Sequence, residues 1–72
     1  MFKSLCYGAK GPKVAEAQIL LQDCGSRIKV NGQYTIGMIA AVRAFQKKNG
    51  LPITGKIDYK TMRKLRSVAK RK

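Results

Sequence analysis

The sequence predicts an all-α domain, a compact three-helix bundle in which one turn–helix unit occurs twice. Three segments carry apolar residues at helical spacing, and a short turn motif precedes the last two of them. The 72 residues leave room for one domain, and a hydrophobic fraction of 44% is typical of a folded chain. We therefore expect a single domain over residues 1–69, followed by a basic tail over residues 70–72.

The first expected helix begins at Gly11-Pro12, because proline suits the first helical position, where its missing N–H would be unpaired in any helix. Gly25 follows the segment and is typical of a left-handed helix terminator. The residues that recur at helical spacing and are expected on its buried face are Val14, Ala17, Leu21 and Cys24. Leu20 is expected to join that face.

The second expected helix runs from about residue 35 to about residue 49. Gly50 ends it, and Pro52 disfavours any continuation. Lys47 and Lys48 fall in its last turn, where positive charge interacts favourably with the helix dipole. The residues at i, i+3, i+4 and i+7 that form its core-facing stripe are Met38, Ala41, Val42 and Phe45.

The third expected helix begins at Asp58, whose carboxylate can accept a hydrogen bond from an otherwise unpaired N–H of the first turn. The residues expected to face inward are Met62, Leu65 and Val68 or Ala69. The cations Lys60, Arg63, Lys64 and Arg66 are expected to face mostly outward. This helix is therefore predicted to bury one narrow apolar stripe beneath a basic surface.

An internal repeat links the second and third helices. Asn31-Gly32-Gln33-Tyr34-Thr35 precedes one of them and Thr54-Gly55-Lys56-Ile57-Asp58 the other, and the two motifs begin 23 residues apart. Each contains a polar residue, a glycine, any residue, a large apolar residue and a residue able to cap a helix. This order predicts a tight turn at glycine, an apolar anchor in the core and a helix start.

The charge is the unusual property of the composition. The chain has 16 Lys and Arg residues against 3 acidic residues, so its formal net charge is +13 at pH 7. Such a field raises encounter rates with polyanions, which include nucleic acid and anionic wall polymers. One hypothesis is therefore nucleic-acid binding, or a place in a virion, through the third helix and the tail. The cations of this hypothesis are Lys60, Arg63, Lys64, Arg66, Lys70, Arg71 and Lys72.

The sequence does not support an active site or a metal site. It contains no histidine, so the usual general base and the activating partner of a catalytic cysteine are both absent. Glu16 and Asp23 are expected to be solvated surface residues. Cys6 and Cys24 are the only cysteines and suit either one disulfide or two buried thiols, not a tetrahedral metal site. We expect no catalysis, no metal and no cofactor.

Nothing in the sequence predicts export by a signal peptide or insertion into a membrane. Residues 1–6 lack the apolar core of a signal peptide, and the longest uncharged apolar stretch, residues 36–42, is too short to span a bilayer. We therefore expect a cytoplasmic or virion-associated protein, unless a partner carries it out of the cell.

Read together, these motifs resemble the short peptidoglycan-binding domain of amidases, lytic enzymes and phage endolysins. The pattern can be followed from residue 5 to residue 65. The matching residues are Gly8, Gly11, Val14, Gln18, Leu21, Gly25, Asn31-Gly32, Tyr34, Ala41-Val42, Phe45-Gln46, Gly50-Leu51, Gly55, Ile57, Thr61 and Leu65. The chain departs from the family's usual residues at Thr35 and Asp58, which replace glycine, and at Met38, which replaces threonine.

The resemblance implies a non-catalytic module that binds bacterial peptidoglycan, since such domains recruit an attached enzyme and do not cut the wall themselves. The partners it implies are peptidoglycan or an anionic wall polymer and a phage or lysin protein; nucleic acid is the alternative partner. The ligand-binding residues expected around the loop before the second helix are Asn31, Gln33, Tyr34, Arg43 and Gln46. For Tyr34, a role as a core anchor is the alternative to stacking on a ligand.

Overall fold

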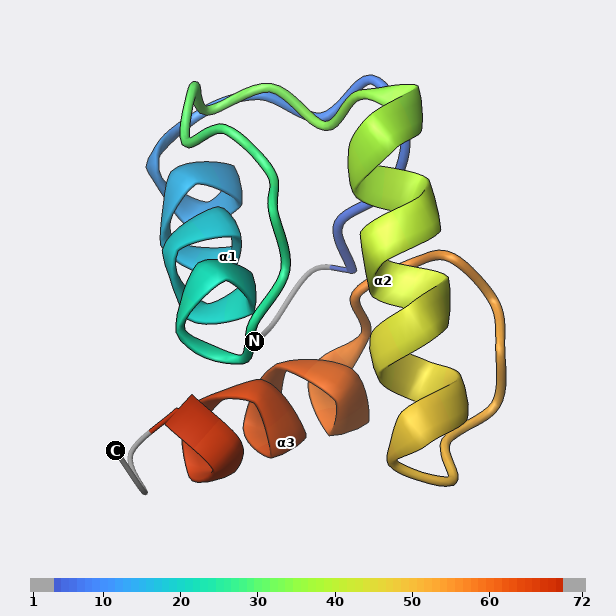
Figure 1. Ribbon diagram of the computed structural model, residues 1–72. Coiled ribbons are helices and arrows are strands. Elements are labelled where there is room, and N and C mark those ends of the chain that lie inside the picture. Colours follow the sequence, from blue (N-terminus) through green and yellow to red (C-terminus); the bar gives the residue numbers. More distant parts are fainter. Residues whose placement is uncertain (1–3, 70–72) are drawn as a thin grey trace.

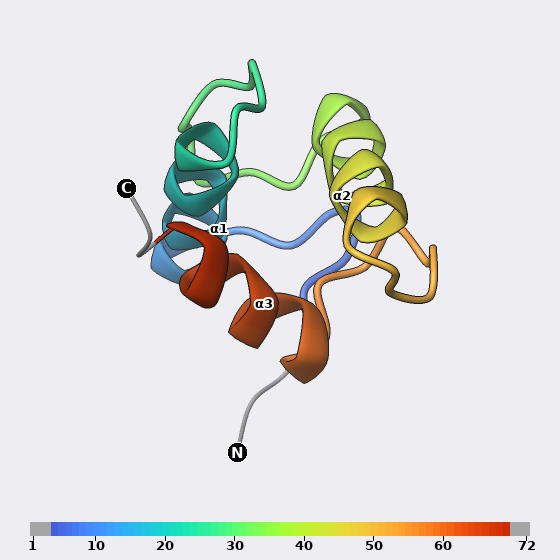
Figure 2. The same cartoon turned by 60° about the horizontal axis from the view of Figure 1, so that its bottom comes forward.

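The computed structural model describes residues 4–69, which form three helices: α1 (Pro12–Asp23), α2 (Ile36–Lys48) and α3 (Tyr59–Ala69). α1 and α2 stand on opposite sides of the molecule, and α3 lies across their lower ends (Figure 1). A second view brings α3 to the front (Figure 2). No strand occurs within residues 4–69, so the predicted all-α three-helix bundle is confirmed. The predicted tail at residues 70–72 lies outside the described residues.

The helix ends follow the local sequence. Pro12 occupies the first turn of α1, and Thr35 and Asn49 flank α2, close to the predicted limits. The Oδ1 atom of Asp58 accepts a hydrogen bond from the N–H of Thr61 at 2.8 Å, which confirms the predicted cap. The side chain of Thr35 makes no such bond. Thr35 is nevertheless the N-cap of α2, as the repeated motif predicts, because its carbonyl oxygen accepts hydrogen bonds from the N–H groups of Met38 and Ile39.

The core is a single cluster between the three helices. Every residue in it is 6% exposed or less. Its members are Val14, Ala17, Leu21, Tyr34, Met38, Val42, Phe45, Ile57, Met62 and Leu65. Leu20, Cys24, Ala41 and Val68 are partly buried against it. The helical faces predicted from apolar spacing are therefore confirmed.

No disulfide joins Cys6 and Cys24 in the structure. Cys24 is partly buried at the end of α1, whereas Cys6 is exposed in the N-terminal segment. Neither alternative from the sequence holds in full, because the two thiols are not bonded and only Cys24 packs on the core.

The internal repeat forms two turn–helix units of the same design. Gly32 and Gly55 adopt φ angles of 73° and 76°, a left-handed conformation that a side chain with a Cβ atom adopts only at a cost. The apolar residue two positions later is buried in both units, with Tyr34 2% and Ile57 0% exposed. The predicted sequence of turn, anchor and helix start is therefore confirmed.

A glutamine from α1 holds the first turn. The Oε1 atom of Gln18 accepts hydrogen bonds from the N–H groups of Asn31 and Gly32, both at 2.9 Å. Its Nε2 atom donates to Oδ1 of Asn31 at 3.0 Å and to the carbonyl oxygen of Gln33 at 2.8 Å. Because Gln18 is only 2% exposed, these bonds leave its buried amide fully paired.

A glutamine from α2 holds the second turn in the same way. The Oε1 atom of Gln46 accepts from the N–H groups of Thr54 and Gly55, both at 3.0 Å. Its Nε2 atom donates to the carbonyl oxygen of Lys56 at 2.9 Å, and the hydroxyl oxygens of Thr54 and Thr61 lie at 3.2 and 3.1 Å. Each turn is thus fixed by the helix that precedes it in the chain.

The N-terminal segment joins the two units. Leu5 exchanges backbone hydrogen bonds of 2.9 and 2.8 Å with Ile57 of the second unit. Farther along, the carbonyl oxygen of Ala9 accepts a hydrogen bond from the N–H of Tyr34 at 2.9 Å, and Lys10 bridges to Gln33. These contacts place residues 7–10 beside the start of α2, and the two segments together line a surface hollow.

Candidate ligand-binding site

A hollow in the described surface lies between the N-terminal segment and the start of α2. Its volume is about 480 Å³. We call it the Tyr7 hollow, and the residues that line it are Tyr7, Gly8, Ala9, Lys10, Gln33, Tyr34, Thr35, Ile36 and Gly37. The backbone bonds between the N-terminal segment and the first turn hold both of its walls in place.

The Tyr7 hollow combines apolar surface with polar groups. Tyr7 and Ile36 are 62% and 72% exposed, although both are large hydrophobic side chains. Lys10 and Gln33 lie beside them and supply a positive charge and an amide. An exposed ring beside a few polar groups suits an amphipathic ligand, because apolar faces pack on the ring while polar groups fix the orientation.

A smaller hollow shares part of this wall. It has a volume of about 210 Å³, and Thr35 and Gly37 line both hollows. Asn31, Arg27 and Lys29 lie on its far side, so the polar rim of the site extends along the loop before α2. Arg27 and Lys29 therefore add positive charge beside the Tyr7 hollow, which would attract an anionic group of a ligand.

The five wall-binding residues predicted from the sequence do not gather at one place. Gln33 lines the Tyr7 hollow, and Asn31 lines the smaller hollow next to it. Arg43 lies against the second turn, where a Cβ atom on Gly55 would be 3.2 Å from its Nε. Gln46 is 0% exposed and holds that same turn, so its side chain offers no surface to a ligand.

Tyr34 is a core anchor in the structure. Its hydroxyl donates a hydrogen bond to the carbonyl oxygen of Gly55, which ties the first unit to the second. Burial raises the pKa of the Tyr34 hydroxyl well above its ordinary value, and the nearby Cys6 adds to the rise. The phenol therefore remains protonated and keeps donating to Gly55, and its ring is not free to stack on a ligand.

Of the residues that line the Tyr7 hollow, sequence reasoning predicted only Gln33 and Tyr34, and the large side chains that it missed are Tyr7, Lys10 and Ile36. A signal for Ile36 was present, because it lies at the start of α2 outside the stripe of Met38, Val42 and Phe45. A large apolar residue on the solvent side of a helix indicates a binding surface when other exposed apolar residues lie next to it. Tyr7 gave no comparable signal, since its neighbours on α2 are distant in the sequence.

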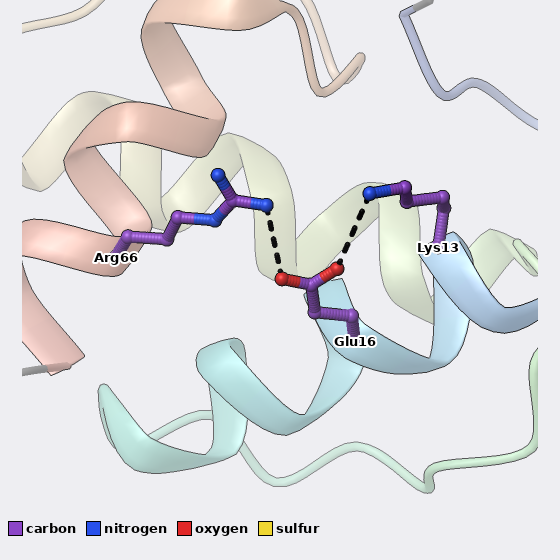
Figure 3. A network of polar contacts seen from close by, with 3 residues as sticks. All are labelled: Lys13, Glu16 and Arg66. Carbon is purple, nitrogen blue, oxygen red and sulfur yellow. Dashed lines mark hydrogen bonds and ion pairs between the residues drawn. The ribbon is translucent and has the colours of Figure 1, made fainter. Parts of the chain in front are cut away.

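The cations of the polyanion hypothesis are divided between two places. Lys60, Arg63 and Lys64 line a third hollow of about 300 Å³ together with Leu51 and Ser67; we call it the α3 hollow. Arg66 instead pairs with Glu16 of α1 at 3.0 Å, and Lys13 approaches the same carboxylate at 3.8 Å (Figure 3). Lys70, Arg71 and Lys72 lie outside the described residues.

Within residues 4–69, no group of three or more His, Cys, Asp and Glu side chains is placed to hold a metal ion. The helices of this part of the chain are all too short or too polar to cross a bilayer.

A family model described as "Putative peptidoglycan binding domain" matches residues 10–65. The chain belongs to this family. The resemblance predicted from the motifs is therefore confirmed. No curated protein matches the chain.

Similar solved structures support the same assignment. The SleB N-terminal domain has a TM-score of 0.89 and 35% identity, and the match covers 93% of each chain. A fused Zn-dependent amidase/peptidase/peptidoglycan-binding protein from Clostridium acetobutylicum matches with a TM-score of 0.86 and 30% identity over 88% of this chain and 28% of its own. A Burkholderia AP3 phage endolysin gives 0.85 and 33%, over 88% of this chain and 24% of its own.

Two conclusions follow from these comparisons. The fold is that of a module which, in the amidase and the endolysin, makes up 28% and 24% of a longer chain. The nucleic-acid alternative receives no support from the family match or from these structures.

Proposed function

We propose that this chain is a non-catalytic module that binds bacterial peptidoglycan through the Tyr7 hollow. The observation that carries the proposal is family membership over residues 10–65, because the matched region contains both turn–helix units and most of the hollow. The similarity to the amidase/peptidase from Clostridium acetobutylicum and to the phage endolysin supports a role beside a wall-degrading enzyme.

The chemistry of the hollow fits a wall fragment. Peptidoglycan presents sugar rings with apolar faces, together with amides and carboxylates from its peptide stems. The exposed Tyr7 ring and the Ile36 side chain would pack on a sugar face, and Gln33 would pair with an amide or hydroxyl group. Lys10 would attract a stem carboxylate, as would Arg27 and Lys29 from the neighbouring rim.

The remaining predicted residues act on this site from within the fold. Asn31 lines the smaller hollow, and its Oδ1 atom accepts hydrogen bonds from the Gln18 side chain and from the N–H of Gln33. Its role in the proposal is to position Gln33 and the rim. Arg43 lies beside the second turn and is not part of the proposed contact surface.

The test is co-sedimentation with purified sacculi that have been stripped of teichoic acid. Tyr7→Ala is expected to weaken binding about tenfold, or about 1.4 kcal/mol, because it removes the aromatic face. Tyr59→Ala is the matched control, since Tyr59 is 59% exposed and lies outside the hollow, against 62% for Tyr7.

A second pair of variants repeats the comparison with an aliphatic side chain. Ile36→Ala is expected to weaken binding, whereas Ile53→Ala, at a 55% exposed position away from the hollow, is expected to leave it unchanged. Absence of wild-type binding at physiological salt would refute the function. Wild-type affinity in both Tyr7→Ala and Ile36→Ala would refute the site.

A further inference from the structure

The α3 hollow gathers three cations on one helical face. Lys60, Arg63, Lys64 and Ser67 occupy positions i, i+3, i+4 and i+7, so their Cα atoms span only about 10 Å along the helix axis. Leu51, from the segment after α2, lines the opposite wall. The result is a basic depression with a hydroxyl group at one end.

These cations have no acidic partner in the described part of the chain. The ion pairs found there all use Glu16, which binds Lys13 and Arg66 on another face of the molecule. The carboxylate of Asp58, at the start of the same helix, accepts a hydrogen bond from the N–H of Thr61. The positive charge of the α3 hollow is therefore open to an external anion.

Arg63 is also held in a defined position. Its guanidinium carbon lies 5.7 Å from the centroid of the Tyr59 ring, within the range of a cation–π contact. A guanidinium fixed in this way loses less entropy when it binds an oxyanion, and its planar array of donors suits phosphate.

The fold does not require cations at these positions, as the internal repeat shows. The two motifs begin 23 residues apart, so each position of α3 corresponds to the position 23 residues earlier in α2. By this alignment, the residues that correspond to Lys60, Arg63 and Lys64 are Gly37, Ala40 and Ala41. The first unit thus has small uncharged residues at the equivalent positions, of which Gly37 and Ala40 are exposed and Ala41 is partly buried against the core. The cations of the second unit are an addition to the shared framework, and an added charge cluster without partners indicates a ligand.

We propose that the α3 hollow binds the phosphate groups of an anionic wall polymer of the polyol-phosphate class, such as a teichoic acid. This second site would act beside the Tyr7 hollow, and the choice of polymer rests on the proposed function, which places the chain at the bacterial wall. Lysines would meet successive phosphates as point charges, while Arg63 would bind one phosphate through two N–H groups. The net charge of +13 would speed the encounter.

Nucleic acid carries the same phosphates, but the surface around the α3 hollow favours the polyol polymer. Binding to single strands normally uses exposed aromatic rings on which bases stack. Tyr59 is the aromatic residue of α3, and the guanidinium of Arg63 lies over its ring. Tyr59 is 59% exposed, but it does not line the α3 hollow, so the hollow itself offers charge without an aromatic stacking platform.

The experiment measures binding of lipid-free poly(glycerol phosphate) to the full chain by isothermal titration calorimetry at physiological salt. The test variant combines Lys60→Gln, Arg63→Gln and Lys64→Gln. It is expected to fold, because these exposed positions correspond to small residues in α2, and its helical circular dichroism verifies this. The affinity is expected to fall by about tenfold or more, as three phosphate contacts are removed.

The matched control combines Lys47→Gln, Lys48→Gln and Lys56→Gln, which removes the same charge from exposed positions outside the α3 hollow. We expect it to lose about twofold at most, through the weaker general field. An equal loss in the two triple variants would overturn the proposal, because net charge alone would then explain binding. Tighter binding of duplex DNA than of poly(glycerol phosphate), at equal phosphate concentration, would also overturn it.

A separate arm keeps this proposal distinct from peptidoglycan binding. The α3 variant is expected to bind polymer-free sacculi as well as the wild type does, because the Tyr7 hollow is intact. Failure of the wild type on those sacculi would refute the proposed function alone. Failure of the wild type on poly(glycerol phosphate) would refute the α3 site alone.

Discussion

Replacing Gln46 by leucine nearly keeps the size of the side chain and removes the hydrogen bonds by which α2 holds the second turn. The N–H of Gly55 loses its acceptor. The N–H of Thr54 and the carbonyl oxygen of Lys56 each lose one of two partners, since the first also donates to the carbonyl oxygen of Pro52 and the second also accepts from the Thr54 hydroxyl. Gly55 is buried, so its N–H becomes an unpaired group away from water, whereas Thr54 and Lys56 are exposed and can bind water instead.

The expected loss follows from this inventory. A buried unpaired N–H costs about 1–3 kcal/mol, and the two groups that water can reach add about 0.5 kcal/mol each, which gives about 3 kcal/mol. Gln18→Leu is expected to cost less, about 2 kcal/mol, because the turn it holds contains the exposed residues Asn31 and Gln33. A loss of about 3 kcal/mol is a large part of the stability of a small domain.

Urea unfolding, followed by helical circular dichroism, measures these differences. Gln22→Leu is the control, because Gln22 is exposed and its side chain makes a single bond, 2.6 Å to the carbonyl oxygen of Ile28. We expect the order of destabilisation to be Gln46→Leu, then Gln18→Leu, then Gln22→Leu. A loss below about 1 kcal/mol in Gln46→Leu would refute the view that this glutamine fixes the turn.

Four further substitutions test other parts of the fold. Gly55→Ala is expected to cost about 2 kcal/mol of stability and Gly50→Ala about 1 kcal/mol. Both glycines have positive φ, but only a Cβ atom at Gly55 would meet side chains, at 3.2 Å. Equal losses in urea unfolding would contradict the steric contribution at Gly55. Tyr34→Phe is expected to be less stable at neutral pH by about 1 kcal/mol. Since burial raises the Tyr34 pKa, the wild type's advantage is present below pH 10.0 and should shrink above it in alkaline unfolding; a constant difference would contradict this. Glu16→Gln is expected to cost about 0.5 kcal/mol, because its pair with Arg66 is 41–47% exposed, and a loss of several kcal/mol would contradict a surface pair.

Helical spacing and turn chemistry were sufficient to predict the architecture. The apolar stripe of α2 and the N-cap at Asp58 are local signals, and both are present in the structure. The repeated motif identified both turns because glycine followed by a large apolar residue describes a turn and its core anchor within five residues. These features depend on neighbours in the sequence, which is why they can be read without the structure.

The candidate site was harder to predict because it depends on contacts between distant segments. The sequence predicts Gln46 as a ligand-binding residue. It lies four residues after Val42, however, and shares the buried side of α2. A polar residue on a buried face needs an internal partner, and the second turn supplies it. Tyr7 is brought to the site by backbone pairing between residues 9 and 34. These residues are far apart in the sequence, so no local pattern predicts the pairing.

The most direct test of the central claim is amide NMR mapping of the chain with muropeptides released from sacculi. We expect the largest changes in amide chemical shift at Tyr7, Gly8, Lys10, Gln33 and Gly37, which line the Tyr7 hollow. The amides around the α3 hollow are expected to stay unchanged, because muropeptides carry no polyol phosphate. Shifts centred on the second turn or on α3, or no shifts at saturating muropeptide, would contradict the account.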